Sequence, residues 1–240
     1  MKNRSIAVYL TIIGFLFAAA IGWYIFAFLT QPEPVPATFD GQRAYTDVQT
    51  QVAFGPRIPG SEGHAKIQAW MREELAKAGW QVEVQESEAL GHPIQNFVAK
   101  RSDESPQVII GAHYDTRMFA DNDPDPANHS LPVPGANDGA SGVAVLLELA
   151  RTLPEDEDTV PVWLVFFDAE ENGRIDGWDW ILGSTEVVKN NPLQPRAVVI
   201  VDMIGDADLT ISKDKNSNAA LTDAVCEVAK ELGYGTIFIP

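Results

Sequence analysis

The spacing of apolar side chains along the chain switches repeatedly between a helical period and a strand period. Residues 61–79, SEGHAKIQAWMREELAKAG, carry large apolar side chains at helical spacing, after a serine suited to an N-cap and before a glycine suited to end a helix. The next segment, WQVEVQES, alternates between polar and apolar residues, as a half-buried strand does. This part of the chain is therefore predicted to be a helix followed by a strand.

The same alternation continues to the end of the chain. NFVAK and QVIIGAHYD are predicted strands, and a loop rich in Asp, Pro and Asn follows over residues 117–134. GASGVAVLLELARTLP is apolar nearly all round, which indicates a buried helix, and SNAALTDAVCEVAKELGYG is a last amphipathic helix. VPVWLVFF and RAVVIVD are continuous apolar runs, typical of parallel strands covered on both faces. The order predicts the α/β class: a three-layer α/β/α sandwich with a mostly parallel mixed sheet.

The first thirty residues differ from the rest. Residues 6–29 are uncharged and mostly apolar, and as a helix they would span roughly 36 Å, which exceeds the hydrocarbon thickness of a bilayer. Lys2 and Arg4 precede this run, so the positive-inside rule puts the rest of the chain outside the cytoplasm. We therefore expect a single transmembrane helix within residues 1–30, a Pro-rich linker over 31–45 and one folded domain over 46–240. A cleaved signal peptide, and hence secretion, is the alternative.

Charge and cysteine content exclude several kinds of partner and site. The formal net charge is -17 at pH 7, and no basic stripe is available to neutralise phosphates, which argues against nucleic acid. Cys226 is the sole cysteine, so neither an intrachain disulfide nor a cysteine zinc cage can form.

Acidic residues gather where the apolar runs end, which is the edge at which open α/β sheets place their sites. Asp138 stands in PGANDGASG, at the entry to the buried helix. Clustered carboxylates repel one another unless a positive charge lies among them, and histidine with carboxylates suits zinc, with manganese and cobalt chemically compatible. We expect the Asp168 carboxylate to accept hydrogen bonds from loop backbone amides and not to bind the metal. The residues that follow the runs are His113, Asp115, Asp168, Glu170, Glu171 and Asp202.

Four segments carry a family resemblance. GAHYDT, PGANDGASGVAVLLELAR, VFFDAEENG with LGS shortly after, and VVIVDMIG resemble the successive metal-site motifs of the zinc aminopeptidase and glutaminyl cyclase superfamily, metallopeptidase family 28. The match runs from about Phe54 to the end of the chain. It implies a phosphorylase/hydrolase-like α/β/α sandwich, one or two zinc ions in a full-length domain, and peptide or protein N-termini as substrates.

The resemblance also implies a role for each matching residue. Asp115 would orient the imidazole of His113, and an unusual cis peptide bond would follow Asp138. Glu170 would act as general base beside a ligating Glu171, and the two can share one water only where the strand gives way to a loop. The implied metal ligands are His113 and Asp202 at the first position, Asp138 as the bridge and Glu171 at the second position.

One feature departs from the family pattern. The second metal position also requires a histidine near the carboxyl terminus, and no histidine follows His129 in this chain. We therefore expect the carboxyl-terminal part of the domain to be missing, or one metal to be lost. His64 and His92 are expected at the surface.

Three functions remain open at this point. An aminopeptidase would use Glu170 to activate water, whereas a glutaminyl cyclase would use it to move a proton while N-terminal pyroglutamate forms. GANDGASG favours the peptidase, and LELAR with GWDWILGS favours the cyclase. A non-catalytic ectodomain that only binds is the third reading. Trp178 and Trp180 are candidates for a substrate pocket, or equally for the core.

Overall fold

The computed structural model describes residues 21, 23, 38–155, 160–190 and 193–239. The chain divides into a unit of residues 1–36 and a unit of residues 37–240, and the folded domain is the second. Within the described residues, no helix combines the length and the hydropathy needed to span a bilayer. The predicted anchor over 6–29 falls outside these residues except at positions 21 and 23, so it stays a prediction.

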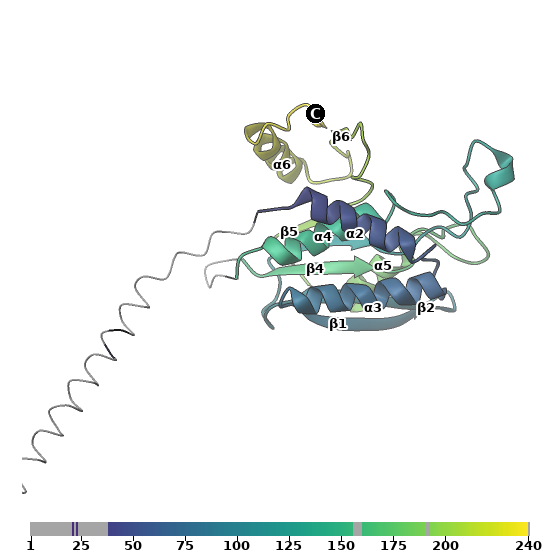
Figure 1. The fold of residues 1–240 in the computed structure, drawn as a ribbon, viewed down its shortest axis with the longest axis horizontal. Helices are drawn as coiled ribbons and strands as arrows, with labels where there is room; N and C mark the ends of the chain where they lie inside the picture. Colours follow the sequence, from purple (N-terminus) through teal and green to yellow (C-terminus); the bar gives the residue numbers. More distant parts are fainter. Residues whose placement is uncertain (1–20, 22, 24–37, 156–159, 191–192, 240) are drawn as a thin grey trace, which may run out of the picture. The chain divides into compact units, whose positions relative to one another are not determined.

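The domain is organised around a five-stranded mixed sheet, ordered β1-β2-β4-β3-β5 (Figure 1). β3 pairs in parallel with both β4 and β5, whereas β2 pairs antiparallel with β1 and with β4. The predicted mixed sheet is confirmed, and its parallel half is β4-β3-β5. The strands are β1 (Gln81–Ala89), β2 (His92–Lys100), β3 (Val108–His113), β4 (Val162–Phe167) and β5 (Ala197–Ile200).

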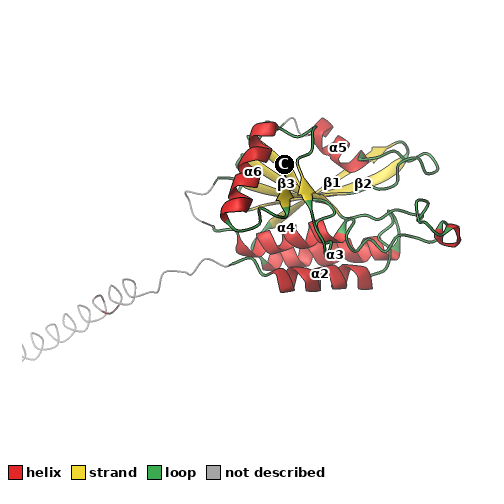
Figure 2. Cartoon of the chain, turned by 90° about the horizontal axis from the view of Figure 1, so that it is seen from above, coloured by secondary structure: helices red, strands yellow, loops and turns green. Residues whose placement is uncertain are grey.

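Helices lie on both sides of this sheet, as a three-layer sandwich requires (Figure 2). α3 (Glu62–Lys77) and α4 (Ala140–Thr152) pack on one face, with α2 (Gly41–Ala53) against α4. α5 (Leu182–Asn190) contacts β1 and β2 from the other face. The remaining elements are the 3-10 turn η1 (Pro126–Asn128), α6 (Ala219–Glu231) and the short parallel pair β6 (Ile211–Ser212) and β7 (Phe238–Ile239).

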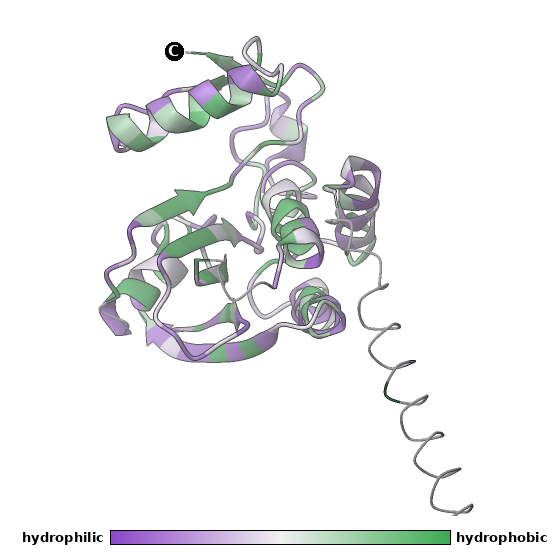
Figure 3. Ribbon diagram, turned by 90° about the vertical axis from the view of Figure 1, so that its left-hand side faces the viewer, coloured by the Kyte–Doolittle hydropathy of each residue, from purple (hydrophilic) through white to green (hydrophobic). Residues whose placement is uncertain are grey.

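The main core lies between the sheet and the helices α3 and α4. Its buried side chains include Met71 and Leu75 of α3, Leu146 of α4 and Phe166 of β4. Figure 3 shows the short central strands coloured hydrophobic along most of their length, whereas the long curved β1 alternates. This contrast follows from position, because side chains of β3 and β4 enter two separate core clusters, whereas β1 is an edge strand with no buried residue.

Helix α2 begins at Gly41, inside the stretch 31–45 assigned from the sequence to the linker, and the division of the chain into domains stays a prediction. The Asp40 carboxylate caps this helix by accepting from the backbone N–H of Gln42 and Arg43. The pattern did not reveal α2 because two of its three buried residues, Asp47 and Gln51, are polar. Asp47 pairs with Arg151 of α4, which makes its burial tolerable.

Candidate metal centre

Three segments that end or follow β3 and β4 converge at one point. His113 is the last residue of β3, Asp138 lies just before α4, and Glu171 follows β4. One ligand atom from each lies within 4.8 Å of the other two. His113 Nε2 is 2.9 Å from an Asp138 oxygen and 3.4 Å from an oxygen of Asp202, which follows β5. The parallel β4-β3-β5 half of the sheet thus brings all four candidate ligands to one edge.

Asp115 connects the histidine to the turn that carries the two glutamates. Its buried carboxylate lies 3.4 Å from His113 Nδ1 and accepts from the backbone N–H of Glu170 at 3.0 Å and of Glu171 at 3.2 Å. The amide of Asn172 donates to the same carboxylate at 3.2 Å. One carboxylate therefore orients both the imidazole and the glutamate turn, which is more than the role expected from the sequence.

Asp168 holds the start of this turn. Its carboxylate accepts from the backbone N–H of Ala169 at 2.8 Å and of Gln95 at 2.9 Å, so the predicted capping role is confirmed. His64 Nε2 lies 2.8 Å from the same carboxylate. The expectation of a surface His64 is wrong, because its side chain is buried against Asp168. Ala169 has φ +50°, and this left-handed turn ends the strand before Glu170.

Arg57 holds the loop that carries Asp138. It is completely buried, and its guanidinium donates to the carbonyl oxygens of Tyr114, Pro134 and Gly135. Burial lowers the pKa of Arg57 to about 10, against the opposing effect of Asp115 and Asp138. Sequence reasoning missed Arg57, since nothing in RIPG marks a buried cation.

Gly139 allows the loop to pass close to the strand end. Its φ is +90°, and a Cβ there would lie 2.9 Å from the Asp115 carbonyl oxygen and 3.3 Å from His113 Cε1. The cis peptide bond expected after Asp138 is wrong, because the described residues contain no cis peptide bond. The positive φ of Gly139 provides the sharp bend instead.

Burial and neighbouring charges shift the pKa values of the ionisable groups at the centre. Burial lowers the pKa of His113, but Asp115, Asp138 and Asp202 outweigh it and hold that pKa well above its ordinary value. Burial raises the pKa of Glu171, and the neighbouring Glu170 carboxyl adds to the rise. The pKa of Glu170 is raised by burial as well. The cluster therefore favours the protonated form of Glu171 unless another positive charge is present.

The donor set fits a zinc ion. His113 Nε2 and Asp138 Oδ1 are buried and lie 2.9 Å apart, but neither forms a hydrogen bond of good geometry among the described residues. Buried ligand atoms that converge from separate segments without such a bond satisfy a cation better than they satisfy one another. An imidazole with carboxylates is a zinc donor set that leaves room for substrate. The roles assigned to individual ligands, and the number of ions, stay predictions.

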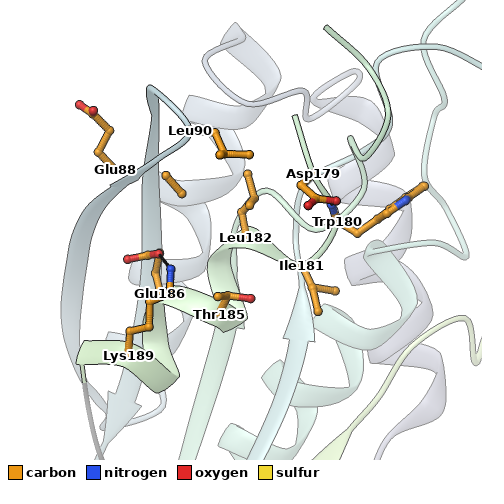
Figure 4. Close-up of a pocket in the computed structure, with 10 residues that line it drawn as sticks. Glu88, Leu90, Asp179, Trp180, Ile181, Leu182, Thr185, Glu186 and Lys189 are labelled. Atoms are coloured by element: carbon orange, nitrogen blue, oxygen red, sulfur yellow. Dashed lines mark hydrogen bonds and ion pairs between the residues drawn. The ribbon is translucent and has the colours of Figure 1, made fainter. Parts of the chain in front are cut away.

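The two candidate pocket tryptophans have different surroundings. Trp178 stacks on His92 with ring centroids 3.7 Å apart, and it packs against a small core formed by Ile94, Ala169 and Leu182. Trp180 lies under the Arg117 guanidinium, whose carbon is 4.8 Å from the ring centroid. Trp180 also lines a cavity beside α5, whereas Trp178 does not (Figure 4).

Arg117 is a second residue that the sequence did not single out for the site. It donates to the Glu171 carbonyl oxygen at 2.6 Å and forms a two-fold ion pair with Asp121, at 2.7 Å for both contacts. It thereby fastens the long loop after β3 to the glutamate turn.

Comparison with known proteins identifies the family of this chain. The profile described as Peptidase family M28 matches residues 96–237. The uncharacterized protein YfbL of Escherichia coli is 39% identical over 103 residues, which are 42% of this chain and 30% of that protein. A Zn-dependent exopeptidase structure from Parabacteroides distasonis has a TM-score of 0.78 at 33% identity, covering 86% of this chain and 77% of that one.

A glutaminyl cyclase structure from Porphyromonas gingivalis has a TM-score of 0.77 at 37% identity, covering 84% of this chain and 75% of that one. The likeness therefore extends both to a Zn-dependent exopeptidase and to a glutaminyl cyclase. The matched segment spans less than a third of the length of YfbL. Because the family profile covers more than half of the residues, the chain belongs to Peptidase family M28.

Proposed function

We propose that this domain is a zinc-dependent hydrolase that cleaves the first residue from peptides, with Glu170 as general base. The observation that carries the proposal is the convergence of His113, Asp138 and Glu171, with Glu170 beside them in a turn held by Asp115. A zinc ion held by these ligands and Asp202 would supply a Lewis acid and a positive charge.

Glu170 performs the proton transfers in this proposal. Asp115 accepts from the backbone N–H of Glu170 at 3.0 Å and of Glu171 at 3.2 Å, so the main chain of the two glutamates is held in one turn. In this proposal Glu171 binds the metal, and the Glu170 carboxylate is the group that accepts a proton. Glu170 takes a proton from the attacking water and passes it to the departing amine.

Glutaminyl cyclisation is the second candidate, favoured by the glutaminyl cyclase structure that is 37% identical to this chain. In that reaction Glu170 takes a proton from the α-amine, the amine attacks the γ-amide of the same N-terminal glutamine, and ammonia departs with the proton. The same residues serve both reactions. In the peptidase reaction water attacks and an amine departs, whereas in the cyclase reaction the α-amine attacks and ammonia departs.

One assay separates these candidates. The zinc-loaded protein is incubated with peptides that begin with Gln and with aminoacyl amides that cannot cyclise, while free amino acid and ammonia are both measured. Free amino acid from many first residues supports the peptidase, whereas ammonia from Gln peptides alone, with pyroglutamate formed, supports the cyclase. Glu170→Gln should abolish either activity, and Glu104→Gln, at an exposed loop carboxylate, is the matched control. Zinc-loaded protein with neither activity contradicts both candidates and favours a binding role.

A further inference from the structure

Asp202 lies on the segment that leaves the outer strand of the parallel half-sheet. In the described sheet β5 pairs with β3 alone, and this pairing reaches as far as Val201, whose N–H donates to the Gly111 carbonyl oxygen at 2.8 Å. Asp202 is the next residue, and its side chain is 46% exposed. The sheet ladder therefore ends before Asp202, and burial contributes little to holding its carboxylate at the metal centre.

Two side chains at the entry to α4 bind the segment that follows β5. Asn137 Oδ1 accepts from the backbone N–H of Gly205 at 2.7 Å. Ser141 Oγ accepts from the backbone N–H of Ile204 at 3.1 Å. The Ser141 hydroxyl in turn donates to the Asn137 carbonyl oxygen at 2.6 Å. Because Asn137 directly precedes Asp138, these hydrogen bonds connect the loops that carry two of the candidate ligands.

The backbone of the segment after β5 also lies close against α4. A Cβ on Gly142 would lie 2.4 Å from the Val201 carbonyl oxygen, and a Cβ on Gly205 would lie 3.0 Å from the Ser141 Cβ. Between Val201 and Gly205, Met203 has φ +48° and is 52% exposed. A left-handed residue that stays half exposed needs other contacts to hold it, and the hydrogen bonds from the next two N–H groups provide them.

Neither side chain is used to cap its own helix. The N-cap residue of α4 is Gly139, which forms no side-chain hydrogen bond. Asparagine and serine beside a helix start ordinarily accept from the N–H groups of its first turn. The acceptor atoms of Asn137 and Ser141 instead meet the segment after β5. Their arrangement thus serves the contact between the two ligand loops rather than the end of the helix.

We propose that Asn137 and Ser141 are positioning residues, which hold the Asp202 carboxylate at the centre and thereby set its zinc affinity. That carboxylate lies 3.4 Å from His113 Nε2. Without the two acceptors, the strained turn at Met203 loses its hydrogen bonds, and the carboxylate is free to turn toward solvent. Groups that orient metal ligands contribute about ten- to hundredfold to metal affinity. The proposal rests on the metal centre of the function proposed above, but not on the reaction catalysed there.

The zinc affinity of the full chain, measured by competition with a chromophoric chelator, tests this role. Asn137→Ala and Ser141→Ala each remove one acceptor, and each should weaken zinc binding by about tenfold or more. Asn122→Ala and Ser130→Ala are the matched controls, because they make the same changes at exposed positions of the loop after β3. These control variants should keep the zinc affinity of the wild type.

A spectroscopic measurement separates positioning from folding. The visible absorption of the Co²⁺-loaded protein reports the number and geometry of the ligands. It should change in Asn137→Ala but not in Asn137→Asp, whose carboxylate can still accept from the Gly205 N–H. Urea unfolding of the metal-free proteins checks that each variant is folded, and Ser141→Ala carries the test if Asn137→Ala does not fold. A contribution to folding alone would lower that stability and leave the zinc affinity and the cobalt spectrum at their wild-type values.

The possible results keep this proposal apart from the proposed function. Wild-type zinc affinity and an unchanged cobalt spectrum in Asn137→Ala and Ser141→Ala overturn the positioning role and leave the function standing. Weaker zinc binding in these variants, together with a zinc-loaded wild type that turns over no substrate, sustains the positioning role and contradicts the function. A wild-type chain that binds no zinc overturns both.

Discussion

Replacing Asp168 by asparagine tests the structural account of the glutamate turn, because the change alters one atom of a fully buried group. The Asp168 side chain is 1% exposed and accepts from three donors: His64 Nε2, Ala169 N and Gln95 N. His64 Nδ1 faces two donors, the Gly60 N–H at 3.4 Å and the Gln68 amide at 3.3 Å. With Nδ1 placed as an acceptor, Nε2 is the nitrogen that donates to Asp168.

Asparagine cannot satisfy all three donors in either orientation of its amide. With its oxygen toward His64 and Ala169, its NH₂ group opposes the Gln95 N–H. In the flipped orientation, the NH₂ group opposes both His64 and Ala169. A hydrogen bond to a charged group contributes about 1.5–3 kcal/mol, and an unpaired buried donor costs about 1–3 kcal/mol. The lost hydrogen bond and the unpaired donor are partly the same effect, so the two values do not add in full. We therefore expect the free energy of unfolding to fall by about 2–4 kcal/mol.

Urea denaturation followed by circular dichroism and by tryptophan fluorescence measures this loss, provided that the two probes give one transition. For a domain of this size the melting temperature should fall by about 2–4 °C for each kcal/mol. Asp103→Asn is the matched control, because that carboxylate is 95% exposed and forms only a 3.5 Å surface pair with Lys100. An Asp168→Asn protein within about 0.5 kcal/mol of the wild type would refute the hydrogen-bond account of the turn.

Four further outcomes are expected. Glu170→Gln should lower kcat by about a hundredfold or more while zinc content by elemental analysis stays near wild type, whereas Glu171→Gln should lose zinc; full activity in the first variant contradicts the base assignment. Removal of zinc by a chelator should lower the melting temperature, and zinc at a hundred times its Kd should restore about 2.7 kcal/mol; identical melting curves argue against a metal in the fold. Burial raises the pKa of Glu148, but its hydrogen bonds with Arg43, with the backbone N–H of Asp40 and with Arg151 together outweigh burial and leave that pKa below its usual value. This carboxylate should therefore stabilise the fold above pH 4.5 and lose that contribution as the pH falls through its lowered pKa, so Glu148→Gln should flatten the acid limb of a stability curve against pH. The full chain should sediment with membranes and be digested by protease added from the extracytoplasmic side; a soluble product that begins after residue 20 would indicate signal cleavage.

Local patterns in the sequence were enough to predict most of the elements and the candidate ligands. The apolar runs became β3, β4 and β5, and Ser61 caps α3 by accepting from the His64 N–H at 3.1 Å. Periodicity and capping depend on residues within a few positions of one another, so a single sequence records them directly. Three of the candidate ligands could be predicted because His113, Glu171 and Asp202 end or follow strands of one parallel half-sheet, whose carboxyl ends share an edge. Asp138 could be predicted from its place in the glycine-rich entry to α4.

Only the tertiary structure decided which buried residues support the candidate ligands at that edge of the sheet. His64 pairs with Asp168 across 104 positions of the chain, and Arg57 reaches the Gly135 carbonyl across 78. The pairing of β2 with β4 also depends on the order of the strands. This pairing positions the β1–β2 hairpin, which forms one wall of the cavity beside α5. Such contacts produce no periodic pattern in the sequence, because the sequence does not distinguish a buried histidine or arginine from an exposed one. Its burial becomes tolerable only when the fold brings a distant carboxylate or carbonyl oxygen to meet it.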